Sequence, residues 1–203
     1  MVGTRVLPIR VGGSWSWTQF RNLAGVAVLA GIGAAALIAP RLKPYLQGPP
    51  AARAMWAETY ETLGQMRAGA DAIVVATVQG TRPGRTVQTP DGSLPFTLVD
   101  LVVEQSIRGE TPSMITVEQT GGDANGETFL VDGDGGPYQT SQRVVLFLKQ
   151  QPDTGYYYLV NPQGRFRIGA DGRLNAAAPD DPVSQRLDTR TLQQADALIR
   201  SPE

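Results

Sequence analysis

Residues 96–107, with the sequence FTLVDLVVEQSI, decide the fold because their side chains alternate with the period of a half-buried strand. Val99 and Leu101 fall on one face of such a strand, whereas Asp100 and Glu104 fall on the other. A strand with one apolar and one polar face is typical of an antiparallel sheet that covers a core on one side. The sequence around this stretch is therefore expected to be mainly β.

Further strands are indicated on both sides of this stretch. Residues 72–78 (AIVVATV) are continuously apolar and rich in β-branched side chains, which predicts a strand buried on both faces. Residues 80–94 carry five glycines and prolines and are predicted to be a loop. Additional short strands are predicted at residues 114–119, 143–149, 156–160, 165–168 and 173–174. Residues 121–136 are predicted to be a Gly- and Asp-rich loop, interrupted by a small apolar patch at residues 129–131.

Helices are expected only at the two ends of this β-rich region. Residues 54–67 place Trp56, Tyr60 and Leu63 on one helical face. A terminal helix begins after Thr191, which has capping-box spacing to Gln194. Seven or eight strands without βαβ alternation predict an antiparallel barrel or sandwich flanked by short helices. We assign this domain to residues 54–175, followed by a tail, residues 176–203, that is irregular up to residue 189 and carries the short helix.

The N-terminal region predicts a membrane address. Residues 1–53 contain six basic residues and no acidic one, and the first carboxylate is Glu58. A basic leader, residues 1–22, precedes an uninterrupted apolar run at residues 23–39, and a proline-rich linker follows at residues 40–53. The run has 17 residues, at the lower limit of the roughly 17–25 that span a bilayer. We favour an uncleaved transmembrane helix over a cleaved secretion signal or a buried soluble helix.

The flanks of the apolar run support the anchor. Trp15, Trp17 and Phe20 precede it and Tyr45 follows it, as aromatic residues do at membrane interfaces. Basic residues are equally numerous on both sides, so charge does not fix the orientation. The short leader and the long downstream domain favour a cell-membrane protein with one span and an extracytoplasmic C-terminal domain. The alternative is secretion after signal cleavage.

Composition excludes several function classes. The chain has no histidine and no cysteine, so it has no Ser-His-Asp triad, HExxH zinc site, thiolate metal site or disulfide. Beyond residue 53, 12 basic residues face 19 acidic ones, a net charge of −7 that disfavours nucleic-acid binding. No dinucleotide or P-loop motif occurs. We therefore expect a protein that is not an enzyme and that carries no cofactor.

The order of motifs resembles a known group of proteins. Residues 70–75 (ADAIVV), a strand ending in IRGE at residues 107–110, the RVVLFL run at residues 143–148 and QGRF at residues 163–166 carry the resemblance. This pattern is similar to a group of exported, membrane-anchored bacterial proteins with a small OB-like barrel, distantly netrin-like. The resemblance covers about residues 56–175 and implies a fold and a compartment, with no functional residues to transfer.

One loop contains candidate ligands for calcium. Asp132 and Asp134 begin a DGDGG sequence, and Asp123 and Asn125 lie close by. An EF-hand loop needs an oxygen ligand at position 5 and a glutamate at position 12, where this chain has Gly136 and Arg143. We favour an exposed turn region over a weak calcium site and expect no bound metal.

Two further groups are candidates for a ligand or partner surface. Tyr156 and Tyr158 share one face of a predicted strand, and Phe147 and Phe166 could extend an aromatic patch, although aromatic core residues are the favoured interpretation. Arg165 and Arg167, with Arg143, could form a cationic strip, although paired surface arginines are favoured.

These observations lead to one expected function and two alternatives. We expect a membrane-anchored extracytoplasmic barrel that binds a ligand or protein, with the bilayer and other membrane proteins as partners. The first alternative is an accessory subunit of a membrane complex, because Gly25, Gly31 and Gly33 would permit close helix packing. The second is a hydrolase that uses carboxylates such as Asp180 and Asp181.

Overall fold

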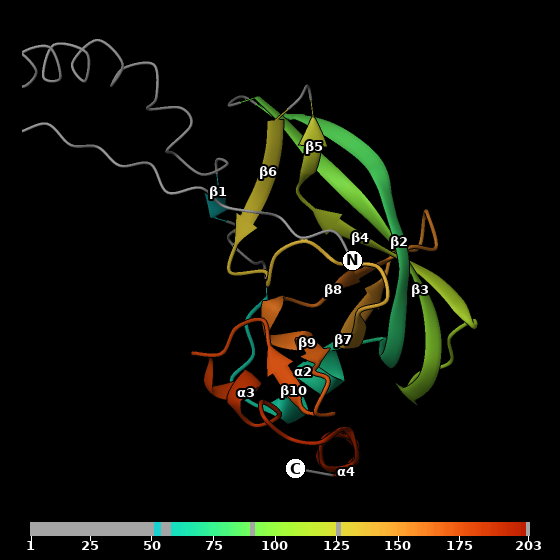
Figure 1. Ribbon diagram of the computed structural model, residues 1–203, viewed down its shortest axis with the longest axis vertical. Helices are drawn as coiled ribbons and strands as arrows, with labels where there is room; N and C mark the ends of the chain where they lie inside the picture. Colours follow the sequence, from blue (N-terminus) through green and yellow to red (C-terminus); the bar gives the residue numbers. More distant parts are fainter. Residues whose placement is uncertain (1–50, 54–57, 90–91, 125–126, 202–203) are drawn as a thin grey trace, which may run out of the picture. The chain divides into compact units, whose positions relative to one another are not determined.

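The computed structural model describes residues 51–53, 58–89, 92–124 and 127–201. The leader, the apolar run and residues 40–50 of the linker lie outside the described residues, as do residues 54–57 of the predicted helix at residues 54–67. The predicted helix start is wrong for the described part, because residues 58–62 are not helical and the helix begins at Leu63. Within the described part of the chain, no helix is long and apolar enough to cross a bilayer. That part is mainly β, with a large sheet and short helices, as predicted (Figure 1).

The main sheet closes on itself. Its strands are β2 (Ala72–Thr89), β3 (Gly92–Arg108), β4 (Met114–Thr120), β7 (Arg143–Gln150), β8 (Tyr157–Leu159), β9 (Arg165–Ile168) and β10 (Leu174–Ala176). Their order is β10-β9-β7-β2-β3-β4-β8, and β8 also pairs with β7. Strands β7, β2, β3, β4 and β8 therefore form a closed ring, in which β4 and β8 pair in parallel and the other neighbours are antiparallel.

Strand β2 is buried on both faces where it pairs with β7. Val74 and Ala76 belong to an apolar cluster that receives side chains from all five strands of the ring. Ile73 and Val75 belong to a second cluster, which also contains side chains from the helices. The prediction of a doubly buried strand at residues 72–78 is confirmed, because successive side chains of a strand point to opposite faces.

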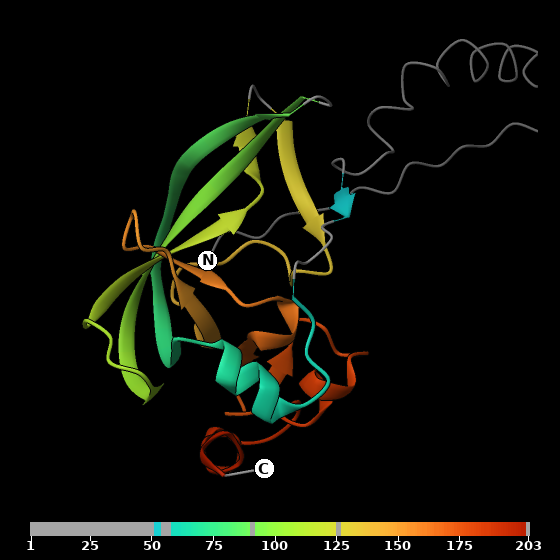
Figure 2. The ribbon, with the colours of Figure 1, turned by 180° about the vertical axis from the view of Figure 1, so that it is seen from behind.

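The second cluster holds the helices against the outside of the ring. It contains Phe147 and Phe166, whose ring centroids are 6.4 Å apart, together with side chains of α2 (Leu63–Gly69), α3 (Pro182–Gln185) and α4 (Leu192–Arg200). The helices gather with β9 and β10 at one end of the domain (Figures 1 and 2). Residues 176–201 are thus part of the same compact unit as the barrel, and the tail is not separate from it.

The predicted loop at residues 80–94 is wrong. Residues 80–89 belong to β2 and residues 92–94 to β3, and the two strands form a long two-stranded ribbon (Figure 1). Strand β2 pairs with β7 only as far as Thr77, so the ribbon beyond Thr77 has an open edge. A proline such as Pro83 is tolerated in an edge strand, because it has no N–H group to donate to a neighbouring strand. Register shifts between Val78 and Gly80 and between Pro83 and Thr86 accommodate the glycines and the proline.

Smaller elements complete the domain. Strands β1 (Ala51–Arg53), β6 (Glu127–Asp132) and β5 (Gly122–Ala124) form a second sheet in that order, in which β1 and β6 are parallel. A 3-10 turn, η1 (Pro162–Gly164), precedes β9. The capping box of α4 is confirmed, with Thr191 accepting from the Gln194 amide. Residues 175–189 are not wholly irregular, because Asp181 caps the short helix α3.

A charged pair joins Glu58 to strand β7. Lys149 Nζ donates to both carboxylate oxygens of Glu58, at 2.6 and 2.7 Å. Asn161 Nδ2 donates to the Glu58 backbone carbonyl at 3.1 Å. The bond from Lys149 and one from the Tyr60 hydroxyl lower the pKa of Glu58. The start of the domain is therefore fastened to β7 and to the segment before η1.

Candidate functional site

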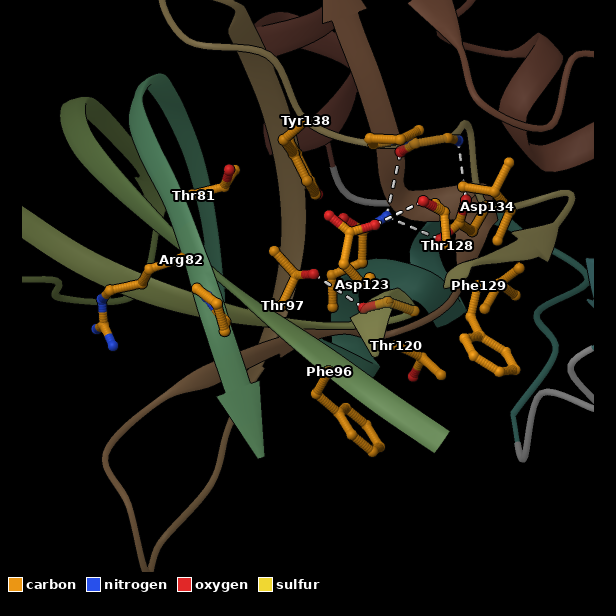
Figure 3. A pocket seen from close by; sticks show the side chains of 18 residues that line it. Thr81, Arg82, Phe96, Thr97, Thr120, Asp123, Thr128, Phe129, Asp134 and Tyr138 are labelled. Atoms are coloured by element: carbon orange, nitrogen blue, oxygen red, sulfur yellow. Dashed lines mark hydrogen bonds between the residues drawn. The ribbon is translucent and has the colours of Figure 1, made fainter. Parts of the chain in front are cut away.

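The described residues form a groove across strands β3 and β4. A hollow of about 410 Å³ lies between these strands, the ribbon of β2 and the β5–β6 hairpin (Figure 3). A second hollow of about 220 Å³ adjoins it. The two share Phe96, Gln119, Thr120 and Asp134 in their linings, and we call them together the β3–β4 groove.

A buried carboxylate forms one wall of the groove. Asp134 is 4% exposed and follows β6 in the segment that leads to β7. One of its oxygens accepts from the Gly136 amide and the other from Gln119 Nε2, both at 2.8 Å. Gln119 also donates to the Gly136 carbonyl at 3.1 Å. Both carboxylate oxygens are thus occupied, which is the arrangement of a structural carboxylate.

The same wall is supported from behind by a buried arginine. Arg165 is 3% exposed, and its Nη1 donates to the backbone carbonyls of Asp134 and Gly136, both at 2.7 Å. Its guanidinium carbon lies 3.7 Å from the centroid of the Tyr138 ring. The Tyr138 hydroxyl is buried and forms no hydrogen bond to the residues that the structure describes. Burial raises the pKa of Tyr138 to about 12.

An aromatic ring stands where the two hollows meet. Phe96, on β3, pairs across from Thr120 on β4. The Arg85 guanidinium lies 4.7 Å from the centroid of the Phe96 ring. Arg85 is itself paired in bidentate geometry with Glu118, at 3.0 and 2.9 Å, and Gln151 Nε2 also donates to Glu118. The arginine therefore covers part of Phe96 while its charge is balanced by the carboxylate.

The two calcium candidates whose side chains the structure describes, Asp123 and Asp134, belong to no metal-binding cluster among the described residues. Asp123 is exposed on β5 and accepts from the Thr128 hydroxyl at 2.6 Å, whereas Asp134 is buried in the groove wall. Asn125 lies outside the described residues, as does the side chain of Asp132. The described part of the chain contains no group of three or more acidic side chains placed to hold a metal ion.

The residues predicted for a ligand or partner surface do not lie together on one surface of the described structure. Tyr158 is 38% exposed and lines the groove, and Tyr156 is half-buried outside it. Arg167 is exposed, but Arg165 is buried and contributes to no surface strip, because the carbonyls of residues 134 and 136 cover its face of β9. Arg143 pairs with Glu104, as the interpretation of paired surface arginines expects.

The core interpretation of the aromatic residues also fits part of the structure. Tyr157, Phe147 and Phe166 are buried, at 5%, 0% and 0% exposure.

One of the two candidate hydrolase carboxylates, Asp181, has a structural role, because it caps α3 and accepts from Gln163 Nε2 at 2.7 Å.

Sequence reasoning missed Phe96, Gln119 and Thr120. One signal could have found the first of them: Phe96 is in phase with Asp100 and Glu104 rather than with Val99 and Leu101. An aromatic side chain on the water-facing side of an alternating strand marks a contact surface where neighbouring apolar residues extend it into a patch. Gln119 and Thr120 carry no comparable signal, because polar residues on that face are ordinary.

The chain matches no known protein-family model, no curated protein and no solved structure.

Proposed function

We propose that this chain is a membrane-anchored extracytoplasmic binding module, in which residues 23–39 cross the bilayer and the barrel binds a ligand in the β3–β4 groove. The groove itself carries the proposal. Its larger hollow falls within the roughly 300–1,000 Å³ typical of ligand sites. It also combines an aromatic ring with hydroxyl and amide groups, as such sites do.

The strand order supports an OB-like barrel. An OB fold is a five-stranded Greek-key barrel that binds ligands on its second and third strands, flanked by the loops between strands 1 and 2 and between strands 4 and 5. In the ring of this domain, counted along the chain, β3 and β4 are the second and third strands. Arg85 of the β2–β3 ribbon and Gln151 of the β7–β8 connection both line the groove. The groove thus lies where this fold class binds its ligands.

Site-specific photo-crosslinking tests the binding role. A benzophenone amino acid replaces Phe129, which lines the groove, in the full-length chain in cells that produce it. The matched control replaces Gln193, an exposed residue of α4. Irradiation should give a discrete adduct from the groove position and none from the control. Equal adducts from both positions, or none from the groove, would contradict the proposal.

Charged substitutions in the apolar run distinguish the accessory-subunit alternative from a self-sufficient binding module. Replacing Val28 and Leu29 with arginine should release a self-sufficient module from the membrane in a folded state, because each charge is costly at the centre of a span. A subunit that depends on helix packing would instead be degraded. Fractionation with circular dichroism of the released protein reads out this difference.

A further inference from the structure

The groove lining offers hydrogen-bonding groups that the protein leaves unused. The hydroxyls of Thr81 and Thr120 form no hydrogen bond to any residue that the structure describes, and both residues line the larger hollow. Asp123 accepts from Thr128 through one oxygen, which leaves its second oxygen as an acceptor. Gln119 uses its amide nitrogen in the wall, so its oxygen remains an acceptor as well. These groups suit a ligand that both donates and accepts hydrogen bonds.

Aromatic rings lie beside these polar groups. Phe96 pairs across from Thr120, and Phe129 pairs across from Gly122, two residues further along the chain from Thr120. Figure 3 shows both rings at the same side of the larger hollow. Both side chains are partly exposed. The electron-rich face of an aromatic ring attracts the partly positive C–H groups of a ligand. The lining therefore matches a ligand whose rings present C–H groups on their faces and hydroxyls around their edges.

The charges of the groove argue against an anionic ligand. Arg82 is paired with Asp100, with nitrogen–oxygen distances of 3.1 and 3.3 Å, and Arg85 is paired with Glu118. The lining adds the carboxylate of Asp123, and the chain beyond residue 53 has 12 basic and 19 acidic residues. A phosphate or sulfate would meet arginines that are already neutralised.

The backbone of the groove floor argues against an added peptide strand. Strand β3 is paired with β4 from Phe96 to Val102 and with β2 along its other edge. Its amide and carbonyl groups are therefore used within the sheet, so an added peptide strand cannot pair with β3. Recognition on β3 must then come from its side chains.

We infer that the β3–β4 groove binds a neutral oligosaccharide. Stacking on Phe96 and Phe129 fixes the sugar rings, and Thr120 and Asp123 bind their hydroxyls. The second hollow adjoins the first across Phe96 and Thr120, so the ligand extends over more than one sugar unit. This inference rests on the proposed function, because it names the ligand class of the same groove.

Calorimetric titration tests the inference on the full-length chain in lauryldimethylamine oxide, a detergent without a sugar headgroup. The neutral probes are the tetrasaccharides of chitin, cellulose and amylose, and the anionic probes are a heparin tetrasaccharide and a ten-nucleotide oligothymidylate. At least one neutral probe should bind saturably, and neither anionic probe should bind more tightly.

Variants then locate the bound sugar. Thr120→Val keeps the shape of the side chain and should weaken binding about five- to tenfold through the lost hydrogen bond. Phe129→Leu should weaken it by at least about tenfold, whereas Phe129→Trp, which retains an aromatic face, should preserve it. Thr140→Val is the matched control, because Thr140 is exposed and lies outside the groove lining, and it should leave the affinity unchanged. Thermal unfolding of each variant checks that the fold is intact.

The outcomes separate this inference from the proposed function. If Phe129 crosslinks in cells but no neutral tetrasaccharide binds, or if only the anionic probes bind, the sugar inference is overturned and the groove remains a binding site. If the tetrasaccharide binds equally to the wild-type, Thr120→Val and Phe129→Leu proteins, the sugar lies elsewhere and the inference is also overturned. Absence of both crosslinking and binding overturns the two proposals together.

Discussion

The buried hydroxyl of Tyr138 allows a prediction whose sign is unusual, because a substitution in the core should stabilise the protein. Tyr138 is 5% exposed and its hydroxyl has no partner among the described residues. A buried polar group without a hydrogen bond costs about 1–3 kcal/mol. Tyr138→Phe removes this cost and leaves a void of one oxygen atom, which costs less than about 0.5 kcal/mol. The variant should therefore be more stable by about 1 kcal/mol, or about 2–4 °C in melting temperature for a domain of this size.

The pH dependence supplies an independent check on the same group. Burial raises the pKa of Tyr138 from 10.0 to about 12. Because the pKa is raised on folding, the pH has no effect on stability through Tyr138 below about pH 10, where the tyrosine is neutral in both states. Between about pH 10 and 12 the unfolded state ionises first, and the folded state loses stability relative to it. At pH 11 the unfolded state gains about 1 kcal/mol from ionising this tyrosine, while the folded state keeps it neutral. The advantage of Tyr138→Phe should therefore grow by about 1 kcal/mol between pH 7 and pH 11.

Urea unfolding of both proteins, followed by far-ultraviolet circular dichroism at pH 7 and pH 11, measures these differences. All other titrating groups are common to the two proteins, so their contributions cancel in the comparison. A variant that is less stable than the wild type at pH 7 would show that the hydroxyl has a partner, such as a buried water. An advantage that stays constant up to pH 11 would refute the assignment of the raised pKa to this residue.

Three further predictions test the charged pairs and the caps. Lys149→Met should raise the pKa of Glu58 from its lowered value toward the ordinary value of a glutamate, measured by carbon NMR of the carboxyl, because the hydrogen bond from Lys149 is lost. It should also remove a contribution to stability that is present near neutral pH and lost as the pH falls. Arg85→Met should cost about 1–2 kcal/mol in urea unfolding, because the side chain of Glu118 is only 6% exposed and loses its bidentate partner. Thr191→Ala should cost about 1 kcal/mol through loss of the capping box of α4.

Matched substitutions control for these changes. Arg82→Met removes a comparable pair, but the side chain of its partner Asp100 is 32% exposed, so the cost should stay below about 1 kcal/mol. Gln193→Ala changes an exposed position of α4 without touching its cap and should stay within about 0.5 kcal/mol. Equal costs for Arg85→Met and Arg82→Met would mean that burial of the carboxylate is not what decides the effect.

The strands that the sequence predicted correctly are those in which each face keeps one environment, either core or solvent, along the whole strand. Residues 72–78 are apolar throughout because both faces of β2 are covered there, and residues 99–104 alternate because one face is solvated. The ribbon formed by residues 80–89 and 92–94 was missed because glycine and proline content predicts turns, and the sequence does not show the β-bulges that accommodate these residues within a strand. Closure of the ring depends on a single parallel pairing, Val117 with Tyr157, between residues 40 positions apart. No local pattern carries that information.

The groove could not be predicted from the sequence, because it too depends on contacts between residues far apart in the chain. The same contacts hold the groove wall in place. A period of two placed Arg165 and Arg167 on one exposed face, but a segment about 30 residues earlier folds over Arg165 and buries it. A buried guanidinium is tolerated only when its donors are satisfied, and Arg165 Nη1 finds the carbonyls of Asp134 and Gly136. Gln119 holds these same two residues from the groove side. The wall is thus fixed from both sides before any ligand arrives, so binding need not bear the entropy of ordering it.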